Sequence, residues 1–339
     1  MRSLIFNIDY NHQPVNIGDF VLHLLVCSLL LEKNKLDYVD VNIISDPNEG
    51  HPDDELRPLL LQSNKKRKIY DIIQMLQLLP RVRSITLHEK PVESIDRINS
   101  NIDTNNIYWP PLEKLLTHQY MYYEAVRVIN QYIFENKTYP TLCFSEYQQN
   151  FALKFYRKHA YPHVPVTINL RNNPYFHSNR NAFLDEWKNF FTMAADTYPA
   201  KFIIISSYGE IDPEIAKLKN VVYAKQYCTS LVDDLSLLSN SAFHLGNPSG
   251  PSLLIYFTEK PYHVFNWQPC VAQYHEAIKA NSATLQLAFA TPLQSFGVVP
   301  ETAVEIKCQF EKIWNSRDWL EWAFVDFYKR QLVEIPYWF

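Results

Sequence analysis

The chain has 339 residues and a net charge of −4, and 47% of its residues are hydrophobic while 20% are charged. This length and composition predict a globular protein of two domains and exclude a disordered chain. The balance of 32 basic and 36 acidic residues, without a long basic stripe, argues against a dedicated nucleic-acid-binding protein. One short basic run at 65–68 reads as a solvated loop or, alternatively, as a contact for an anionic membrane surface.

The first half of the chain alternates short β-rich runs with longer helical patterns. Strands are predicted at 2–10, 38–46 and 84–89. Helices are predicted at 18–34, at 69–82 with a break near Pro80, and at 112–136. The segment 48–68 is rich in Pro, Asp, Glu and Lys and therefore predicts a loop.

The second half shows the same alternation more clearly. Strands are predicted at 164–171, 200–207, 220–225, 242–246 and 260–266, and helices at 179–199, 212–219, 230–241, 251–259 and 310–332. Strand and helix exchange about every 20–25 residues, as β-α-β units of a parallel sheet require. We therefore expect an α/β fold of two Rossmann-like β/α/β domains facing a cleft, with domains at 1–155 and 156–310 and a C-terminal helix within 311–339 that packs back on the core.

The five cysteines are scattered without a C-x-x-C pair, which predicts a reducing compartment and argues against a disulfide framework or a zinc site. The first residues lack the pattern of a signal peptide. The longest apolar stretch covers about thirteen residues, fewer than a membrane span needs. We expect a cytoplasmic protein, either free or peripheral to the inner face of the membrane.

Only six glycines occur, where average usage of about 7% would give roughly twenty-four. Three of them, Gly18, Gly246 and Gly250, stand at predicted strand-to-helix transitions. The stretch from Gly246 to Ser252 reads GNPSGPS and precedes a predicted helix, whose N-terminal amides are a site for phosphate. The alternative is an ordinary serine-capped helix start. The residues that we expect to bind the phosphate are Gly246, Asn247, Ser249, Gly250 and Ser252.

Two arginines follow the first strand of the second half. Arg171 lies at the end of that strand, and Arg180 lies nine residues further on. Guanidinium forks suit diphosphate oxygens, so both are predicted to bind a diphosphate-containing ligand. For Arg180 an ion pair with Asp185 or Glu186 is the alternative.

Gly18 and Asp19 follow the first strand of the chain, at the start of the first helix. Asp19 is predicted to act as a general base that takes the proton of an attacking hydroxyl. Alternatively, its carboxylate only complements the helix dipole. Gly18 and His12, which lies in the preceding loop, are expected to contact the molecule that carries this hydroxyl. His244, before the GNPSGPS turn, is expected to be a packed core histidine.

Together, IGDFVLHLL and SLVDDLSLLSNSAFHLGNPSGPSLLIYFTEKPYHVF resemble the two-Rossmann (GT-B) glycosyltransferases, especially the heptosyltransferase-like bacterial cell-surface sugar transferases. The resemblance implies that Asp19 is the base on the acceptor side and that Gly246 to Ser252 hold the donor diphosphate. It also implies that Tyr223 contacts the nucleotide base, and Tyr208 is expected to line the same pocket. The paired arginines resemble those of fucosyltransferase-like members.

Two features depart from that family. The loop NHQPVN replaces its glycine-rich N-terminal loop, and after the turn only Glu259 stands near the place of the acidic residue that holds the donor ribose. No D-x-D motif occurs, so the predicted reaction needs no metal and no cofactor, and protein groups stabilise the leaving diphosphate.

The sequence therefore predicts a glycosyltransferase that moves a sugar from a nucleotide-diphosphate donor to a hydroxyl of a glycan or glycolipid, with inversion. The alternatives are a nucleotide-sugar epimerase or hydrolase of the same fold, and a non-catalytic nucleotide- or sugar-binding protein.

Overall fold

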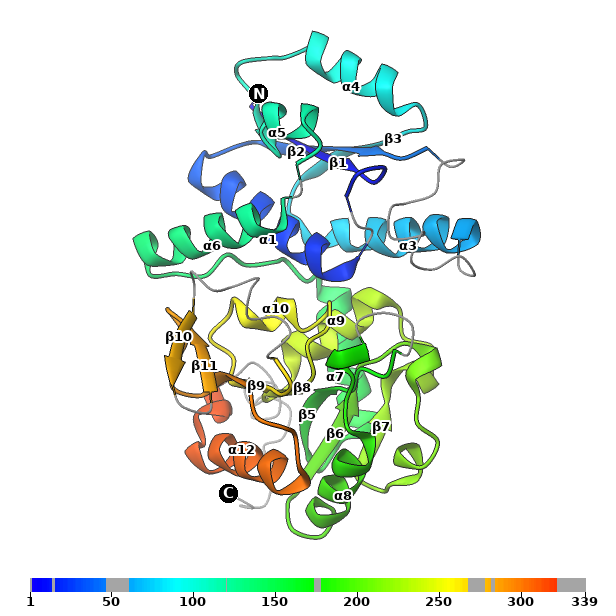
Figure 1. Ribbon diagram of the computed structural model, residues 1–339, viewed down its shortest axis with the longest axis vertical. Coiled ribbons are helices and arrows are strands. Elements are labelled where there is room, and N and C mark those ends of the chain that lie inside the picture. Colours follow the sequence, from blue (N-terminus) through cyan, green and yellow to red (C-terminus); the bar gives the residue numbers. More distant parts are fainter. Residues whose placement is uncertain are drawn as a thin grey trace. The chain divides into compact units, whose positions relative to one another are not determined.

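The protein forms two compact units, Met1–Ser145 and Glu146–Phe339, in the computed structural model shown in Figure 1. The structure describes residues 2–13, 16–46, 61–119, 121–173, 178–267, 278–281 and 284–321. The division precedes helix α7 (Glu146–His159), whereas the sequence led us to expect it after residue 155. Helix α7 goes with the second unit because Tyr156 donates a hydrogen bond to the carbonyl of Leu237.

The first unit is built on a sheet of four parallel strands. These are β1 (Ser3–Asp9), β2 (Tyr38–Ile44), β3 (Val82–His88) and β4 (Ile107–Trp109), in the order β3-β2-β1-β4. Leu4 of β1 is paired with Val39 of β2 on one side and with Ile107 of β4 on the other. The strand order therefore reverses between β1 and β4, and ligands of open parallel sheets bind beyond the strand ends at such a switch point.

Helices cover both faces of this sheet. They are α1 (Ile17–Lys33), α3 (Leu61–Met75), α4 (Pro91–Ser100), α5 (Leu112–Leu116) and α6 (Tyr122–Asn136), with a 3-10 turn at Leu76–Leu78. Helices α1, α3 and α6 lie on one face, and α4 and α5 lie on the other (Figure 1). Helix α1 is buried on nearly all sides, which fits its almost entirely apolar sequence.

The predicted strands of this unit are confirmed, but two predictions for the connecting segments are wrong. The pattern at 112–136 is divided into α5 and α6, and residues 61–68 are helical rather than a loop. The prediction also omitted α4 and the three-residue strand β4. The remainder of the predicted loop, at 48–60, lies outside the described residues.

The second unit contains an eight-stranded sheet. Its strands are β5 (Val164–Asn169), β6 (Ala200–Ile204), β7 (Val221–Tyr223), β8 (His244–Gly246), β9 (Tyr262–Val264), β10 (Ile278–Asn281), β11 (Thr284–Leu287) and β12 (Gln294–Gly297). Their order is β10-β11-β12-β9-β8-β5-β6-β7, parallel from β12 to β7 and antiparallel among β10, β11 and β12. The predicted parallel strands are confirmed, and their order reverses between β5 and β8. The sequence analysis did not predict β10 to β12.

The helices of the second unit are α7, α8 (Leu184–Ala194), α9 (Leu231–Asn240), α10 (Leu253–Tyr256) and α12 (Ala303–Ser316). Short 3-10 turns lie at Ser178–Arg180, Tyr208–Glu210, Ile215–Lys217, Ala224–Tyr227 and Asp318–Glu321. The helix predicted at 212–219 is only one of these turns. No helix in the described ranges is long and apolar enough to cross a membrane.

Helices α8 and α12 close the main core of the second unit. Phe310 of α12 packs against Phe190 of α8, Phe202 of β6 and Phe243 directly before β8, with ring centroids 5.5–5.8 Å apart. Helix α12 ends at Ser316 because Arg317 takes a left-handed conformation with φ 63°. The single helix predicted over 310–332 is therefore wrong at this point, and residues 322–339 lie outside the described part of the chain.

Candidate functional site

The switch point of the second unit brings the predicted donor-binding segments to one edge of the sheet. Asn169, the last residue of β5, is paired in parallel with Gly246, the last residue of β8. The segment carrying Arg171 and Arg180 follows β5, while the GNPSGPS turn follows β8. Carboxyl ends of parallel strands share an edge, so both segments begin beside each other.

Gly246 is glycine because two strands approach closely there. Its φ of 143° is a conformation that L side chains rarely adopt. A Cβ at this position would lie 2.6 Å from the backbone nitrogen of Asn169 and closer still to its carbonyl oxygen. Among the described glycines Gly246 alone has a positive φ. At this position, therefore, a chain that is otherwise poor in glycine requires one.

The GNPSGPS turn presents three backbone amides. The N–H groups of Ser249, Gly250 and Ser252 donate to no described residue. By contrast, the first amides of α10 bond back into the turn, from Leu253 to the Gly250 carbonyl at 3.2 Å and onward. Helix α10 has only four residues, so the prediction of a helix N-terminus as the anion site is wrong. The available donors belong to the turn itself.

Buried side chains support this turn on its core side. Asn247 and Ser252 are fully buried, whereas Ser249 and Gly250 are half-buried. The Ser252 hydroxyl lies 3.0 Å from Ser249 Oγ and 3.1 Å from His244 Nε2. His244 is a packed core histidine, as predicted, and burial lowers its pKa to about 3. Asn247 and Ser252 thus support the turn, and Ser249 and Gly250 remain accessible.

Asn247 connects the turn to a buried carboxylate. Its side-chain amide donates to Glu301 Oε2 at 2.9 Å, and Trp187 Nε1 donates to the same oxygen at 3.2 Å. The backbone N–H of Phe183 donates to Glu301 Oε1. Burial raises the pKa of Glu301 to about 7. This network fixes the position of the Asn247 side chain, which supports the turn.

The raised pKa of Glu301 predicts a pH dependence of stability. In the folded state the group holds its proton up to about pH 7, but in the unfolded chain only to about 4.5. Its contribution is therefore complete below pH 4.5 and is lost as the pH rises through 7, by roughly 3 kcal/mol. Glu301→Gln cannot titrate, so its stability relative to the wild type should rise by that amount between pH 4.5 and 7.

Urea unfolding of both proteins at several pH values measures this change. The constant cost of placing a Gln amide against N–H donors does not vary with pH, so it cancels from the comparison. A stability difference that stays the same from pH 4.5 to 8 would show that Glu301 is ionised throughout.

Arg171 and Arg180 differ in their settings. Arg171 is half-buried directly after β5, and its carbonyl accepts a hydrogen bond from Ala182 at 2.8 Å. Arg180 is also half-buried, and its Nε has no hydrogen-bond partner among the described residues. The alternative ion pair of Arg180 with Asp185 or Glu186 does not form in the described structure.

The two predicted tyrosines, Tyr208 and Tyr223, differ in their exposure to solvent. Tyr208 follows β6 and is 52% exposed, with Lys225 Nζ 5.9 Å from its ring centroid. Tyr223 is fully buried at the end of β7, and its hydroxyl accepts from the backbone N–H of Asp212 at 3.2 Å. Burial raises its pKa to about 12. The expected contact of Tyr223 with a nucleotide base is thus corrected, because its ring packs in the core.

Asp19 lies in the first turn of α1, beside buried Gly18. Asn16 caps this helix, since its Oδ1 accepts from the Asp19 backbone N–H at 2.8 Å. The Asp19 side chain lines a small cavity together with Tyr10, Gln13 and His23. Burial and the charge of Asp19 raise the pKa of Tyr10 well above its usual value. The geometry fits both a base and a favourable partner of the helix dipole.

The sequence analysis did not identify His23, one helical turn after Asp19. Its Nδ1 accepts a hydrogen bond from Trp109 Nε1 at 3.0 Å. Burial lowers its pKa to about 4, so the ring is neutral at pH 7 and carries its proton on Nε2. The i, i+4 spacing of Asp19 and His23 is the signal that could have found it, because such residues share one helix face.

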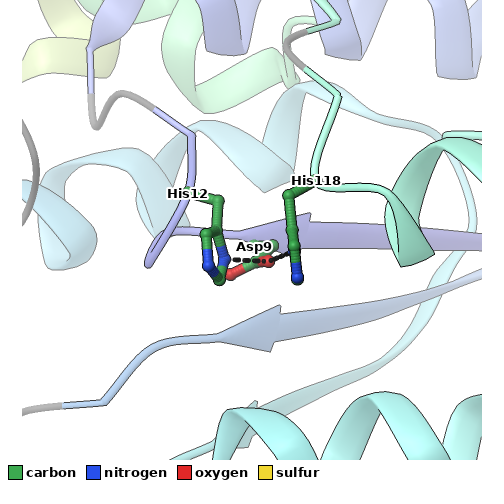
Figure 2. A group of neighbouring side chains, drawn as sticks. All are labelled: Asp9, His12 and His118. Atoms are coloured by element: carbon green, nitrogen blue, oxygen red, sulfur yellow. Dashed lines mark hydrogen bonds and ion pairs between the residues drawn. The ribbon is translucent and has the colours of Figure 1, made fainter.

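His12 belongs to a cluster that was also missed (Figure 2). Asp9 Oδ2 lies 2.7 Å from His12 Nδ1 and 3.1 Å from His118 Nδ1. The two imidazole rings are stacked, with centroids 3.6 Å apart. Asp9, His118 and Gln13 also line a small pocket that is partly open to solvent. No sequence pattern indicates the cluster, because His118 comes from the segment after α5.

Comparison with known proteins finds similarity in structure only. No protein-family model and no curated protein matches the chain. A glycosyl transferase of family 9 from Veillonella parvula DSM 2008 matches 92% of this chain over 89% of its own, with a TM-score of 0.51 and 11% identity.

Two further structures match less well. The E. coli ADP-heptose LPS heptosyltransferase II matches 94% of this chain over 100% of its own, with a TM-score of 0.47 and 9% identity. The fucosyltransferase NodZ from Bradyrhizobium matches 76% of this chain over 93% of its own, with a TM-score of 0.33 and 15% identity. The first match shows that the chain has the GT-B-like α/β fold of a family 9 glycosyltransferase.

Proposed function

We propose that this protein is a glycosyltransferase that moves a sugar from a nucleotide-diphosphate donor to a hydroxyl of a glycan or glycolipid. The observation that carries the proposal is the switch point between β5 and β8, where the unpaired amides of half-buried Ser249 and Gly250 and two arginines follow adjacent strand ends. Backbone amides and guanidinium groups are the donors that bind phosphate oxygens best. The shared fold with a family 9 glycosyltransferase agrees with this assignment.

The second unit would bind the donor. The amides of Ser249 and Gly250 and the Ser249 hydroxyl would hold the diphosphate, and Arg180 and Arg171 would neutralise it. Tyr208 is exposed beyond β6 and would contact the nucleoside. Charge that develops on the leaving phosphate oxygen would be stabilised by these groups, so departure of the diphosphate would need no metal ion.

The first unit would bind the acceptor, with Asp19 as the general base and His12 and Gly18 nearby. The acceptor oxygen attacks the anomeric carbon while the bond from that carbon to the diphosphate oxygen breaks. The electron pair leaves with the diphosphate, and the proton of the hydroxyl passes to the Asp19 carboxylate. This single displacement inverts the anomeric centre.

The experiment is a release assay with a panel of UDP-, GDP-, CMP- and ADP-linked sugars, with and without acceptor glycans. Nucleotide release that requires an acceptor would support transfer. Release without an acceptor would indicate a hydrolase instead, and binding without release a non-catalytic protein. A thermal-shift series with the free nucleotides selects the base first, because a bound nucleotide raises the melting temperature.

Arg180→Ala is expected to weaken nucleotide-diphosphate binding by roughly 10–100-fold. This range corresponds to the loss of one charged hydrogen bond of about 1.5–3 kcal/mol. Isothermal titration with the nucleotide selected above measures the change, and Arg157→Ala on the exposed surface of α7 is the matched control. Equal affinities for the two variants would remove Arg180 from the donor site.

A further inference from the structure

The Asp9, His12 and His118 cluster, here called the Asp-His-His cluster, lies at the switch point of the first unit. Asp9 is the last residue of β1, and His12 lies in the loop that follows it. His118 comes from the segment after β4, the strand that lies beside β1. The crevice beyond two such strands is where open parallel sheets bind ligands. The fold thus brings three side chains with metal-ligand chemistry to this place.

The possible ligand atoms of the cluster lie close together. One such atom from each of Asp9, His12 and His118 lies within 4.8 Å of the other two. Ligands 2.0–2.1 Å from a tetrahedral ion are about 3.3 Å apart. The oxygen-to-nitrogen distances of 2.7 and 3.1 Å are shorter than this spacing by about 0.6 and 0.2 Å. Both histidines are about 40% exposed, so their rings have room to move outward by this amount.

The charge of Asp9 also favours a cation. Its side chain is 2% exposed, and a buried carboxylate is normally paired with a charge or coordinates a metal. Neither Lys nor Arg forms an ion pair with Asp9 in the described part of the chain, and its ion-pair partners are His12 and His118. A divalent cation bound by all three side chains would bring a positive charge next to the Asp9 carboxylate.

The backbone holds the three ligands in place. The N–H of Asn11 donates to Asp9 Oδ1 at 3.1 Å, which leaves Oδ2 for the histidines. His118 ends α5 with φ 51°, a left-handed position usually taken by glycine, and Gln119 N–H closes the turn on the Lys114 carbonyl. Gln13 Nε2 donates to the Gln119 carbonyl at 2.9 Å and so joins the two segments.

We propose that the Asp-His-His cluster is a binding site for a divalent transition-metal ion. Two imidazole nitrogens and one carboxylate oxygen form a donor set suited to Zn²⁺, Mn²⁺ or Fe²⁺, whereas Mg²⁺ and Ca²⁺ prefer oxygen ligands. Three protein ligands leave at least one coordination position for water or a bound oxygen. The site shares His12 with the proposed acceptor side, but it uses none of the groups that are proposed to bind the donor in the second unit.

The experiment is isothermal titration of the full chain, stripped with a chelator, with ZnCl₂ alone, and then with MgCl₂. We expect one Zn²⁺ per chain and no binding of Mg²⁺ at the same concentration. His12→Ala and His118→Asn should each weaken Zn²⁺ binding at least roughly tenfold. Even substitutions of residues that only hydrogen-bond to metal ligands cause a loss of this size. Asn is chosen at 118 because it tolerates a left-handed backbone.

The matched control is His163→Ala, which removes an exposed histidine of the second unit and should leave Zn²⁺ binding unchanged. Absence of a single Zn²⁺ site in the wild type would overturn the proposal. So would a site that keeps wild-type affinity in both His12→Ala and His118→Asn. Because the nucleotide-release assay reads donor chemistry and this titration reads metal binding, either proposal can fail without the other.

Discussion

Asp19→Asn is expected to lower the rate of sugar transfer by about 10²–10⁴-fold while nucleotide binding stays unchanged. Asparagine has nearly the same shape but cannot accept the proton of the attacking hydroxyl, and general-base catalysis contributes a factor of this size. The measurement is the acceptor-dependent release rate at saturating donor, beside the nucleotide dissociation constant. A variant with full transfer activity would show that another residue is the base.

The control for this variant must separate catalysis from helix stability. Asp19 also lies at the positive end of α1, where loss of a charge costs about 0.3–1 kcal/mol. Asn16→Ala removes the cap that accepts from the Asp19 N–H, at a similar cost of about 1 kcal/mol, but keeps the carboxylate. If the dipole is the only role of Asp19, both variants should lose stability alike and keep their activity.

Gly246→Ala is expected to destabilise the second unit by about 4 kcal/mol or more. The new methyl group would meet the backbone of Asn169 in β5, and backbone cannot move aside as a flexible side chain can. A φ of 143° adds strain for any residue with a Cβ. Urea unfolding measures the loss, and where the variant is not recovered folded, its soluble yield gives the same answer.

Gly209→Ala is the matched control, because a Cβ there meets nothing within 4 Å. Its stability should stay within about 0.5 kcal/mol of the wild type, or rise slightly as the unfolded chain loses freedom. A Gly246→Ala protein as stable as Gly209→Ala would mean that β5 and β8 lie further apart than described.

The parallel sheets could be predicted because their signal is local. Each strand from β5 to β9 is a short apolar run, and the helices between them show their own periodicity. Strand β4 has three residues, as β7, β8 and β9 do, but it stands between the polar stretch 100–106 and two prolines, a setting typical of a loop. The break between α5 and α6 depends on the left-handed His118, a backbone conformation that no apolar periodicity reports.

The site was predictable only where one segment carries it. The GNPSGPS turn stood out because glycine is scarce, and Gly246 indeed takes a conformation that needs it. The prediction for Tyr223 was wrong because a residue at a strand end can point into the core as easily as out of it. The Asp-His-His cluster joins residues 9 and 118 through the pairing of β1 with β4, a tertiary contact that a single sequence does not reveal.

The aromatic packing of α12 has a consequence for synthesis on the ribosome. Phe310 fills the space between α8 and strands whose residues are translated some 70–120 positions earlier. Trp319, fully buried, stacks on Trp314 to complete that packing. Until these residues leave the exit tunnel, the nascent second unit exposes Phe190, Phe202 and Phe243 to water, so it should be the half that needs a chaperone.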